Sequence, residues 1–569
     1  MAIDPSLPSG FSKNETIKSA SRHLRGQIAA ELSSDAAAFS DESEQLLKFH
    51  GIYQQDDRDR RKEARARGLD KHHQLMIRTR IPGGVMSADG YLAHDEIARR
   101  WANGTLRVTT RQDFQLHGVL KGNARRSIKA INDALMTTLG GCGDVNRNVM
   151  CCPAPGEGAF HAEVDRWIGE IVRELTPRTR AYHEIWLDGE VIESSEPETE
   201  PVYGERYLPR KFKIAVALEG DNCVDLYAND LALVAMRDGD GSLRGFNVLV
   251  GGGLGRTHHK PETFVAVAQP LGFVTPERMI DVARAVVMVQ RDYGDRTNRK
   301  HARLKYTIAD RGLEWFRSEV EARSGCQFEA AEKLQWKPVD DHLGWHEQGD
   351  GRLYVGLFIE NGRIADVGSA RYATGLRKVV EELRPDIRLT AQQNVILAGI
   401  PIEARHRVEQ ILATHGVTAV AGIPRALRHS MACPAIPTCG LAVAEAERAL
   451  PALIRRIAAD LEDLGLGGER ISFRMSGCPN GCSRPYLGDV GFVGTTLGKY
   501  DVMLGGDFNG TRLNRVYAPN VSIDEIPRLL RPLFEEFGRD RAANEGFGEW
   551  VDRVGFDALR ERSVVGGAA

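Results

Sequence analysis

Four cysteines in the last quarter of the chain have the residue type and spacing of metal ligands. Cys433 and Cys439 form a C-x5-C pair, and 38 residues later Cys478 and Cys482 form a C-x3-C pair. Four thiolates suit a soft, four-coordinate centre, which is either an iron–sulfur cluster or structural zinc. Zinc pairs usually enclose about two to four residues, so the second pair fits zinc and the first fits it poorly. The spacing therefore favours an iron–sulfur cluster, with zinc and an unliganded set as the alternatives.

A second group of candidate residues is cationic and lies in the first half of the chain. In RKFKIAVAL (210–218) the apolar residues alternate, which places Lys211 and Lys213 together on the opposite strand face. Arg78 and Arg80 share a face of LMIRTRI in the same way. Cations on faces that would otherwise pack inward need an anionic partner. That partner is either Asp and Glu in ordinary ion pairs or a polyanionic ligand.

The elements that position these residues occur twice. LRVTTRQDFQLHGV (106–119) aligns with IRLTAQQNVILAGI (387–400) at a shift of 281 residues, and the same shift aligns Arg147 with Arg428 and Cys152 with Cys433. Shared spacing across several separated motifs indicates an internal duplication. A repeat this long predicts two homologous halves related by a pseudo-twofold axis. Because each half mixes strand and helix patterns, the fold class is α+β.

The two copies differ in the chemistry of their side chains. Copy one has Cys152 but no second cysteine pair, and copy two lacks most of the polar positions of copy one. If residues 106–117 are largely extended, one face of copy one carries Arg107, Arg111, Gln115 and His117. Copy two keeps only the first of these, as Arg388. We therefore expect copy one to hold an anion and copy two to hold the metal.

Copy two also shows how its cysteines are delivered. Apolar residues between 450 and 464 follow helical spacing, with Pro451 restarting or kinking that helix. RISFRMSG (470–477) alternates as a half-buried strand should, and it leads into the Pro-Asn-Gly turn between Cys478 and Cys482. Glycine and asparagine let that turn curl around a compact ligand.

Composition excludes several classes of protein. The 569 residues carry a formal charge of −3, and the one basic run, residues 58–73, contains acidic residues typical of a solvated helix face. No apolar run is long enough to span a bilayer, and the N-terminus lacks a signal-peptide pattern. Nine cysteines without a secretory signal favour a reducing, cytoplasmic setting. GGGLG (251–255) lacks dinucleotide-binding spacing, so we interpret it as a close-packed turn.

Longer stretches of the sequence point to a family. The chain resembles the siroheme-containing sulfite and nitrite reductases, and it is most similar to the hemoprotein subunits of assimilatory, NADPH-dependent sulfite reductases. The stretches that carry the resemblance are FHGIYQQDDRDRR, TRQDFQLHG, NRNVMC, YLPRKFK, LVGGGLG, MACPAIPTC, CPNGCSRPYLGDVGFVG, LGGDFNGTRLNR and EGFGEW. The cysteine-containing stretches are the most specific, and the likeness runs nearly from end to end.

The resemblance implies a duplicated, pseudo-twofold fold with ferredoxin-like and α/β cofactor-binding subdomains. The expected parts are an N-terminal extension (1–70), a ferredoxin-like half (71–138), a siroheme- and substrate-binding half (139–345), a second ferredoxin-like half (346–425) and a [4Fe–4S]- and siroheme-binding half (426–569). The extension is expected either to wrap the body or to meet a partner, and its opening, which is rich in Ser, Asp and Glu, is expected to be partly disordered.

The resemblance also assigns roles to single residues. It implies that Cys433, Cys439, Cys478 and Cys482 hold a [4Fe–4S] cluster and that the Cys482 thiolate is also the axial ligand of the siroheme iron. Siroheme carries eight carboxylates, so it is the polyanion that copy one requires. The residues implied around sulfite are Arg78, Arg147, Lys211 and Lys213. Those implied around the macrocycle are Arg107, Arg111, Gln115, His117 and Asn480.

The implied reaction is the six-electron reduction of sulfite to sulfide, with an electron-donating flavoprotein subunit that oxidises NADPH, or a ferredoxin, as partner. Three positions depart from the usual sulfite reductase sequence. Gly440 after the second cysteine is more typical of nitrite reductases, and Pro434 and Ser483 are also less typical. Nitrite reduction to ammonia is therefore the alternative activity, and a non-catalytic zinc or iron–sulfur scaffold is the alternative outside this class.

Overall fold

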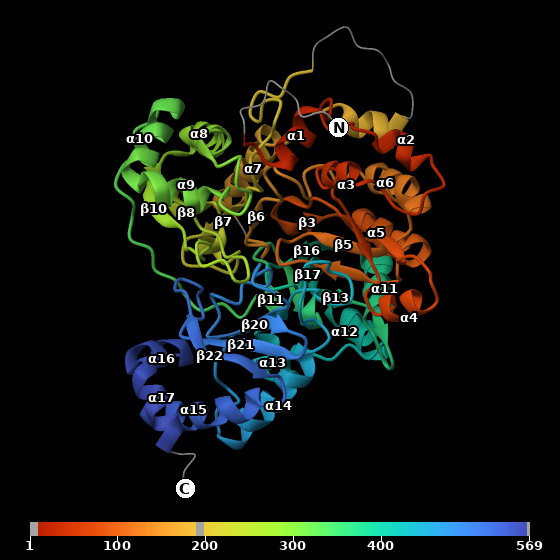
Figure 1. Ribbon diagram of the computed structural model, residues 1–569. Coiled ribbons are helices and arrows are strands. Elements are labelled where there is room, and N and C mark those ends of the chain that lie inside the picture. The colour runs from red at the N-terminus through yellow and green to blue at the C-terminus, as the bar shows by residue number, and fades with distance from the viewer. Residues whose placement is uncertain (1–9, 157, 189–197, 566–569) are drawn as a thin grey trace.

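The computed structural model describes residues 10–156, 158–188 and 198–565. Within these residues the strands form four five-stranded sheets and one two-stranded ribbon, with helices around them (Figure 1). The sheets fall into two pairs, and the members of each pair share one strand pattern. The structure thus has the α+β class and the internal duplication that the repeated sequence predicts.

The first pair consists of antiparallel sheets that exchange one strand. In each, the last strand comes from the opposite half of the chain, so neither sheet is completed by its own half. The first sheet has the order β1 (Ile52–Asp56), β2 (His73–Arg78), β5 (Phe114–Val119), β4 (Leu106–Val108) and β13 (Arg363–Ile364). The second has the order β11 (Gly344–Glu347), β12 (Arg352–Leu357), β17 (Val395–Pro401), β16 (Asp386–Leu389) and β3 (Val85–Met86).

Each of these sheets carries a pair of helices, and the helices of the two halves meet where α11 packs against α5. The helices are α5 (Ala88–Trp101) and α6 (Ala124–Asp133) in the first half, and α11 (Tyr372–Leu383) and α12 (Arg405–Thr414) in the second. Ser87 caps α5 by accepting a hydrogen bond from the Gly90 amide at 3.1 Å, as expected of a serine at a helix start.

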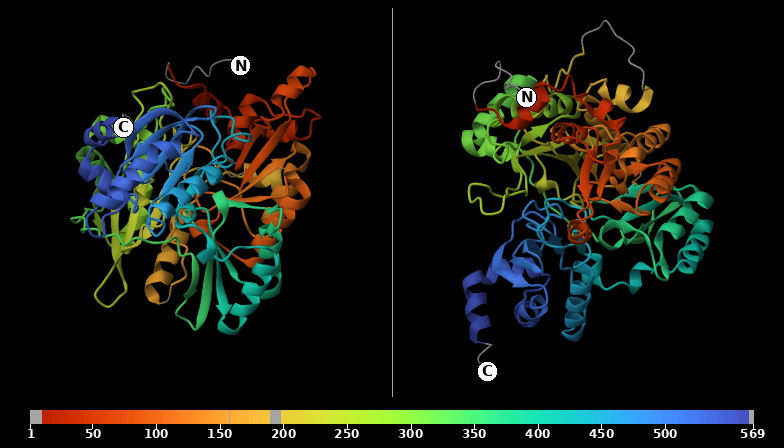
Figure 2. Two further views of the ribbon diagram at one scale, coloured as in Figure 1. Left: turned by 90° about the horizontal axis from the view of Figure 1, so that it is seen from below. Right: turned by 45° about the vertical axis from the view of Figure 1, so that its right-hand side comes forward.

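The second pair of sheets carries the candidate cofactor residues. Both run parallel, parallel, antiparallel, antiparallel from first to last strand. One contains β6 (Met150–Cys151), β7 (Ile214–Leu218), β8 (Leu231–Arg237), β9 (Leu243–Val250) and β10 (Gln269–Val274). The other contains β18 (Ser430–Ala432), β19 (Phe473–Ser476), β20 (Val490–Thr496), β21 (Lys499–Leu504) and β22 (Arg515–Ser522). The right-hand view of Figure 2 shows the second of them, in blue, as a separate lobe below the rest.

Helices on these lobes complete the architecture. In the first half they are α7 (Ala159–Glu174), α8 (Met279–Tyr293), α9 (Leu304–Arg311) and α10 (Leu313–Ser324). In the second they are α13 (Arg425–Arg428), α14 (Leu450–Asp463), α15 (Ile526–Asp540), α16 (Phe547–Val554) and α17 (Phe556–Val565). The helix predicted after residue 450 is α14, and Pro451 lies in its first turn, where a missing amide costs nothing.

Two local predictions need correction. Strand β19 is buried on both faces, not half-buried, because it lies between parallel neighbours in the middle of its sheet. Strand β7 begins at Ile214, so Lys211 and Lys213 precede it, although the Lys213 carbonyl still accepts from the Leu231 amide of β8 at 3.1 Å. They sit where the chain enters the sheet, next to residues that face the interior.

The N-terminal region packs onto the first half. Helices α1 (Lys13–Ser19), α2 (Ile28–Leu32) and α3 (Asp41–Leu47) contribute Ile17, Ile28 and Leu46 to the main core. Strand β1, which lies inside the range expected to form an extension, is the edge strand of the first sheet. The opening residues, 1–9, for which partial disorder is expected, lie outside the described residues.

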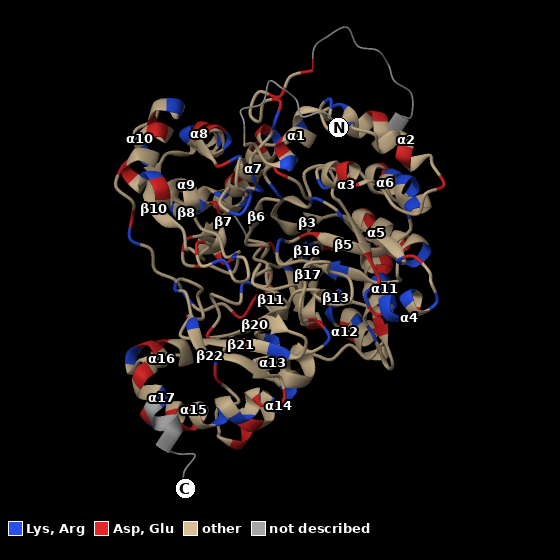
Figure 3. Cartoon of the chain, in the orientation of Figure 1, with Lys and Arg blue, Asp and Glu red and all other residues tan. Residues whose placement is uncertain are grey.

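The surface carries both charges. Figure 3 shows Lys and Arg mixed with Asp and Glu on the outer helices, in agreement with a formal charge of −3. Helix α4 (Arg61–Ala66) lies in the basic run and has no buried residue, as predicted for a solvated helix. Among the described residues, no helix combines the length and the apolar character needed to cross a membrane.

Candidate functional site

Parallel pairing of two strands brings the four cysteines to one edge of a sheet. Ala432 in β18 pairs with Met475 in β19, and Cys433 and Cys478 follow these strands in the same direction. In each pair, a short loop after the first cysteine brings the second one, Cys439 or Cys482, back toward the same edge. Cys433 and Cys478 are buried, Cys439 is half-buried and Cys482 is exposed.

Backbone and amide groups surround the buried thiols. The Gly477 amide donates to Cys433 Sγ at 3.3 Å, and Asn480 Nδ2 donates to Cys478 Sγ at 3.4 Å. Burial, followed by the charge of Cys482, raises the pKa of Cys433 above its ordinary value and that of Cys478 to about 11. Thiolates at this site therefore need a positive metal centre to form at neutral pH.

The spacing of the four sulfurs separates a cluster from a single ion. A tetrahedral zinc with Zn–S bonds of about 2.3 Å holds its sulfurs about 3.8 Å apart. Among the described residues, another group of potential metal ligands has its ligand atoms within 4.8 Å of one another. The four thiols of the two cysteine pairs do not belong to that group. Four thiols that share a site but lie farther apart fit a centre containing several iron atoms.

Five buried or half-buried cations gather beside this edge without carboxylate partners. Within the described part of the chain, no ion pair within 4.0 Å involves Arg78, Arg111, Arg147, Lys211 or Lys213, whereas most other buried arginines have one. Such a set is costly unless an anion binds to it, because each charge has lost its water. These unpaired cations support the prediction, made from the sequence, that copy one binds a polyanion.

Backbone carbonyls hold three of these cations in place. Arg147 Nε donates to Gly143 O at 2.9 Å, and Arg78 Nη1 donates to Gly141 O at 3.5 Å. Arg111 donates from Nη2 to Ile214 O at 2.5 Å, at the start of β7. Neutral acceptors orient these guanidinium groups without cancelling their charge.

The two lysines have altered acidity. Burial, with the charges of Arg210 and Arg147, lowers the pKa of Lys211 to about 7. Burial and the charge of Lys211 lower the pKa of Lys213 well below its ordinary value. A thiolate at Cys482 raises both pKa values. An anion bound here would act in the same direction and restore the ammonium form.

The prediction that residues 106–117 are largely extended is wrong. They form a hairpin of β4 and β5, and its turn includes Gln112 at a φ of 55°. In the antiparallel ladder Gln115 pairs with Arg107 on one side and with Arg78 on the other. His117 lies two residues further along the same face of β5. With its oxygen toward Arg78, the Gln115 amide accepts from Arg78 Nε at 3.2 Å and donates to His117 Nε2 at 3.2 Å.

Arg111 has left the group that extended alternation would have produced, whereas Arg107 stays beside Gln115 but has a carboxylate partner. Arg111 lies in the hairpin turn and reaches toward β7, where it joins the lysines. Arg107 is 1% exposed, and its Nη1 donates to Glu447 Oε2 at 2.8 Å. Its Nη2 donates to the carbonyl of Ala432, next to Cys433. Arg107 shares Glu447 with Arg363, and its bond to Ala432 supports the cysteine loop.

Cys482 interacts electrostatically with both the thiols and the cations. Its charge raises the pKa of Cys433, Cys439 and Cys478. It also interacts with Arg78, Arg107, Lys211 and Lys213. Thr110 Oγ1 donates to the Cys482 carbonyl at 2.9 Å, which ties the hairpin turn to the cysteine loop. Cys482 is thus placed to contact both centres.

A buried ion-pair network at this junction has no counterpart in the sequence prediction. Arg474 Nη1 donates to Asp225 Oδ2 at 2.8 Å, and Arg484 Nε also donates to Asp225. Arg484 further donates to the carbonyls of Thr110 at 2.8 Å and Ala391 at 2.7 Å. Arg484 could have been found from the sequence because it lies two residues after Cys482, in the second cysteine motif. Asp225 lies in a loop with no motif that would mark it.

GGGLG is a close-packed turn, as interpreted. A Cβ on Gly252 would lie 2.2 Å from Tyr227 O, so only glycine fits there. Lys305 Nζ donates to Gly253 O at 3.0 Å and to Gly255 O at 2.8 Å. A Cβ on Gly255 would lie 3.5 Å from Asn480 O. The turn therefore supports the loop that carries the last two cysteines.

Comparison with known proteins places the chain among relatives of matching length. Sulfite reductase [NADPH] hemoprotein beta-components from Oceanobacillus iheyensis and Methylobacterium sp. (strain 4-46) are 46% and 48% identical to it, over 95% and 96% of this chain and 94% and 91% of theirs. The Mycobacterium tuberculosis NirA protein has a similar structure, with a TM-score of 0.79 at 25% identity over 97% of this chain and 98% of that one.

Two family descriptions match the repeated halves. Residues 67–134 and 346–415 match the nitrite/sulfite reductase ferredoxin-like half domain. Residues 142–328 and 425–564 match the nitrite and sulphite reductase 4Fe-4S domain. These matches cover the exchanged sheets and the two lobes that meet at Cys482. The chain belongs to the nitrite and sulphite reductase family.

Proposed function

We propose that the chain is the hemoprotein component of an assimilatory sulfite reductase, which reduces sulfite to sulfide at a siroheme coupled to a [4Fe–4S] cluster. The observation that carries the proposal is that the charge of Cys482 acts both on three further thiols and on Arg78, Lys211 and Lys213, which have no carboxylate partner within 4.0 Å among the described residues. A non-catalytic scaffold does not require a thiol that interacts with both groups. The names of the relatives support the choice of sulfite as substrate.

The residues fit both cofactors. Cys433, Cys439, Cys478 and Cys482 would hold the cluster, and Cys482 would also help to hold the siroheme. Arg111, Gln115, His117 and Asn480 would lie against the macrocycle. His117 Nδ1 is buried without a hydrogen-bond partner, which suits a site whose remaining polar atoms belong to a ligand. When bound, the two cofactors supply the electrons one at a time.

The protein side chains would bind the substrate and deliver protons. We assign Arg78, Arg147, Lys211 and Lys213 to the sulfite dianion. Arginine offers fixed charge and paired hydrogen bonds, while lysine can also donate a proton. Burial lowers the pKa of Lys211, and a bound anion would raise it again, so Lys211 would carry a proton to donate once sulfite is bound. Sulfur gains six electrons overall, and its three oxygens leave as water after protonation.

The experiment that tests the function compares two substrates on the purified holoprotein. With reduced methyl viologen as donor, we expect sulfide from sulfite and a kcat/KM for sulfite that exceeds the value for nitrite. The visible spectrum should show siroheme, and metal analysis should show iron. A strong preference for nitrite would replace the proposed substrate, and a colourless protein containing only zinc would end the redox assignment.

We propose that the electron donor is a separate flavoprotein that oxidises NADPH. The support is the bracketed NADPH in the names of the relatives, together with a chain in which GGGLG is a packing turn, not a nucleotide site. Turnover with NADPH and such a flavoprotein, measured against turnover with reduced ferredoxin, decides between the donors. A cytoplasmic setting is part of the proposal, because all nine cysteines are free thiols.

A further inference from the structure

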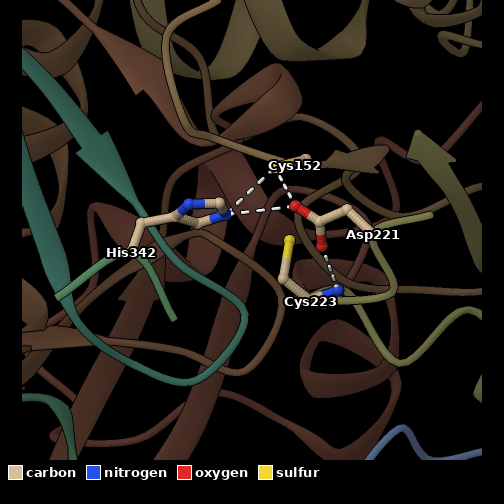
Figure 4. Close-up of side chains that lie close together, drawn as sticks. All are labelled: Cys152, Asp221, Cys223 and His342. Atoms are coloured by element: carbon tan, nitrogen blue, oxygen red, sulfur yellow. Dashed lines mark hydrogen bonds and ion pairs between the residues drawn. The ribbon is translucent and has the colours of Figure 1, made fainter. Parts of the chain in front are cut away.

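A second group of metal-binding side chains lies away from the four cysteines. Cys152, Asp221, Cys223 and His342 each point one potential ligand atom at a common centre, and these atoms all lie within 4.8 Å of one another (Figure 4). Both cysteines are buried, and the other two side chains are partly buried. The family assignment gives none of these residues a role.

The distances within the group match those of a small tetrahedral ion. Cys152 Sγ lies 3.1 Å from Asp221 Oδ2 and 3.4 Å from His342 Nε2. His342 Nε2 lies 3.2 Å from Asp221 Oδ2. Ligands at zinc bond lengths of about 2.0–2.3 Å are separated by about 3.3–3.8 Å around a tetrahedron. Only small shifts are therefore needed to admit the ion.

The arrangement does not suit a catalytic triad. In a Cys-His-Asp triad the carboxylate binds one imidazole nitrogen and the thiol binds the other. Here both Cys152 and Asp221 approach the same atom, Nε2 of His342. Three groups that converge on one point, with a second thiol beside them, form a coordination shell and not a proton relay.

Three separate segments are held in position to build this group. Cys152 directly follows β6, as Cys433 follows β18 in the second copy. Asp221 and Cys223 lie in the loop between β7 and β8, where the Cys223 amide donates to Asp221 Oδ1 at 2.8 Å. His342 lies just before β11, in the segment that joins the two halves. The segment between the halves thus contributes one ligand to a shell whose other three ligands come from the first half.

The backbone at His342 adopts a strained conformation that directs its side chain toward the other three ligands. Asp341 and His342 both have left-handed φ values, 51° and 55°, which non-glycine residues rarely adopt. Thr390 Oγ1 and Asn394 Nδ2 fix Asp341 by donating to its Oδ2 at 2.6 and 2.7 Å. A Cβ on Gly356 would lie 2.1 Å from the His342 carbonyl, so glycine there admits the bend.

We propose that Cys152, Asp221, Cys223 and His342 bind one structural Zn²⁺ ion that fastens the segment between the halves to the first half. Two thiolates, an imidazole and a carboxylate are ligands that zinc accepts, and four protein ligands leave no open position for chemistry. Binding releases one proton from each thiol to solvent, and no electron is transferred. Cys223 also lines a cavity between the halves, which gives the ion a route inward.

The first test measures zinc in the wild-type holoprotein. Protein incubated with zinc sulfate and then desalted is expected to retain about one zinc per chain. X-ray absorption at the zinc edge should show two sulfur and two nitrogen or oxygen ligands. A shell of four sulfurs would mean that zinc occupies the four-cysteine site, and an absence of retained zinc would also overturn the proposal. Neither result depends on sulfite turnover.

The second test uses matched variants. Cys152→Ser combined with Cys223→Ser, and separately His342→Asn, should lower zinc content at least about 10-fold. Cys326→Ser and His346→Asn remove another buried thiol and a nearby imidazole and should leave zinc unchanged. Iron and siroheme content should match wild type in all four proteins. Wild-type zinc content in the site variants would contradict the assignment.

A third measurement needs no variant, in case the site variants fail to fold. In zinc-loaded wild-type protein, iodoacetamide should leave Cys152 and Cys223 unlabelled until a chelator removes the ion, as peptide mass spectrometry can show. Labelling that is unaffected by the chelator would contradict the proposal. A disulfide between Cys152 and Cys223 in the native protein would do so as well, because a disulfide cannot supply two thiolates.

Discussion

At the scale of single residues, the four cysteines of the candidate cluster are not equivalent. Cys433 and Cys478 are buried and accept hydrogen bonds from the protein, whereas Cys482 is exposed and faces the cations. Burial raises the pKa of the first two, so a metal must hold them as thiolates. Their surroundings make Cys482 the ligand that a second cofactor can share.

Replacing Cys482 with serine should abolish coupling between the proposed cofactors. Serine keeps the size of the side chain but cannot supply a thiolate, so sulfite turnover should fall at least about 100-fold. Activity with reduced methyl viologen and the electron paramagnetic resonance spectrum of the reduced protein measure the effect. Cys326→Ser, which changes a buried thiol elsewhere, serves as the control. Full activity in the Cys482 variant would remove it from the bridge.

The two lysines give a second prediction for single residues. Lys211→Met and Lys213→Met keep side-chain length but remove charge and donors from the substrate pocket. Each should lower kcat/KM for sulfite by about 10²–10³, the usual effect of losing one donor to a developing charge. Siroheme absorbance should persist. Lys378→Met changes a lysine that is 60% exposed and should behave as wild type; unchanged kinetics in both pocket variants would place the pocket elsewhere.

The sequence predicted residues whose relationships are local. The two cysteine pairs and the basic positions around residues 78 and 211–213 follow from spacing and alternation, whereas Arg147 was implied by the family resemblance. The set around His342 could not be predicted, because Cys152 and His342 lie 190 residues apart and only the fold makes them neighbours. The partner of Arg107 escaped prediction for the same reason, since Glu447 belongs to the other half.

At the scale of elements, the hairpin of β4 and β5 organises the site. An extended run would have placed four polar side chains in one row, but the turn at Gln112 sends Arg111 toward β7 and pairs Arg107 with Gln115. Within β5 the predicted alternation holds, because Gln115 and His117 lie on one face. Sequence spacing alone does not reveal a turn whose central residue is glutamine, because that residue type gives no turn signal.

Helix α1 is joined to the body by a buried ion-pair cluster. Asp144 Oδ2 accepts from Arg299 Nη1 at 2.6 Å and lies 3.7 Å from Lys18 Nζ. Lys18 also donates to Leu208 O at 2.7 Å and pairs with Glu15 at 2.5 Å. Removing one member of such a cluster leaves the others charged and without water. The attachment of the N-terminal helices should therefore depend on Asp144.

Asp144→Asn should destabilise the protein in a pH-dependent way. Burial alone would raise the pKa of Asp144, but Arg299 and Lys18 outweigh it and hold the pKa far below its usual range. The ionised carboxylate therefore adds stability at any pH above its unfolded pKa of about 3.9, and this contribution is lost as the pH falls through the lower folded pKa. At neutral pH the variant should lose about 3–5 kcal/mol of unfolding free energy.

Urea unfolding of wild type and variant over a series of pH values measures this difference. The gap should stay constant from neutral pH down to about 5 and should narrow below about 4. Asp41→Asn is the matched control, because Asp41 is 85% exposed and lies 3.8 Å from Lys13 in the same region; it should have little effect. A gap that does not change on acidification would show that packing, and not charge, anchors α1.

At the scale of the whole molecule, the two halves exchange strands. Strand β3 of the first half completes the second sheet through pairs such as Ile387 with Met86, and β13 of the second half completes the first. Glu447 adds a link by accepting from both Arg107 and Arg363. One apolar core runs through both ferredoxin-like halves. The repeat predicted two similar halves, but not their interdependence, since strand exchange leaves no local sequence pattern.

Neither half should therefore fold alone. A cut after Lys333, in an exposed segment before the second half, gives fragments 1–333 and 334–569. Each lacks the strand that completes its antiparallel sheet and exposes apolar core, so each should be aggregated or unfolded when expressed singly. Co-expression should restore one complex that contains iron and siroheme, because the missing strands and Glu447 are then supplied in trans. Size-exclusion chromatography and circular dichroism distinguish these cases, and a monodisperse, cooperatively unfolding single fragment would show that the exchanged strands are dispensable.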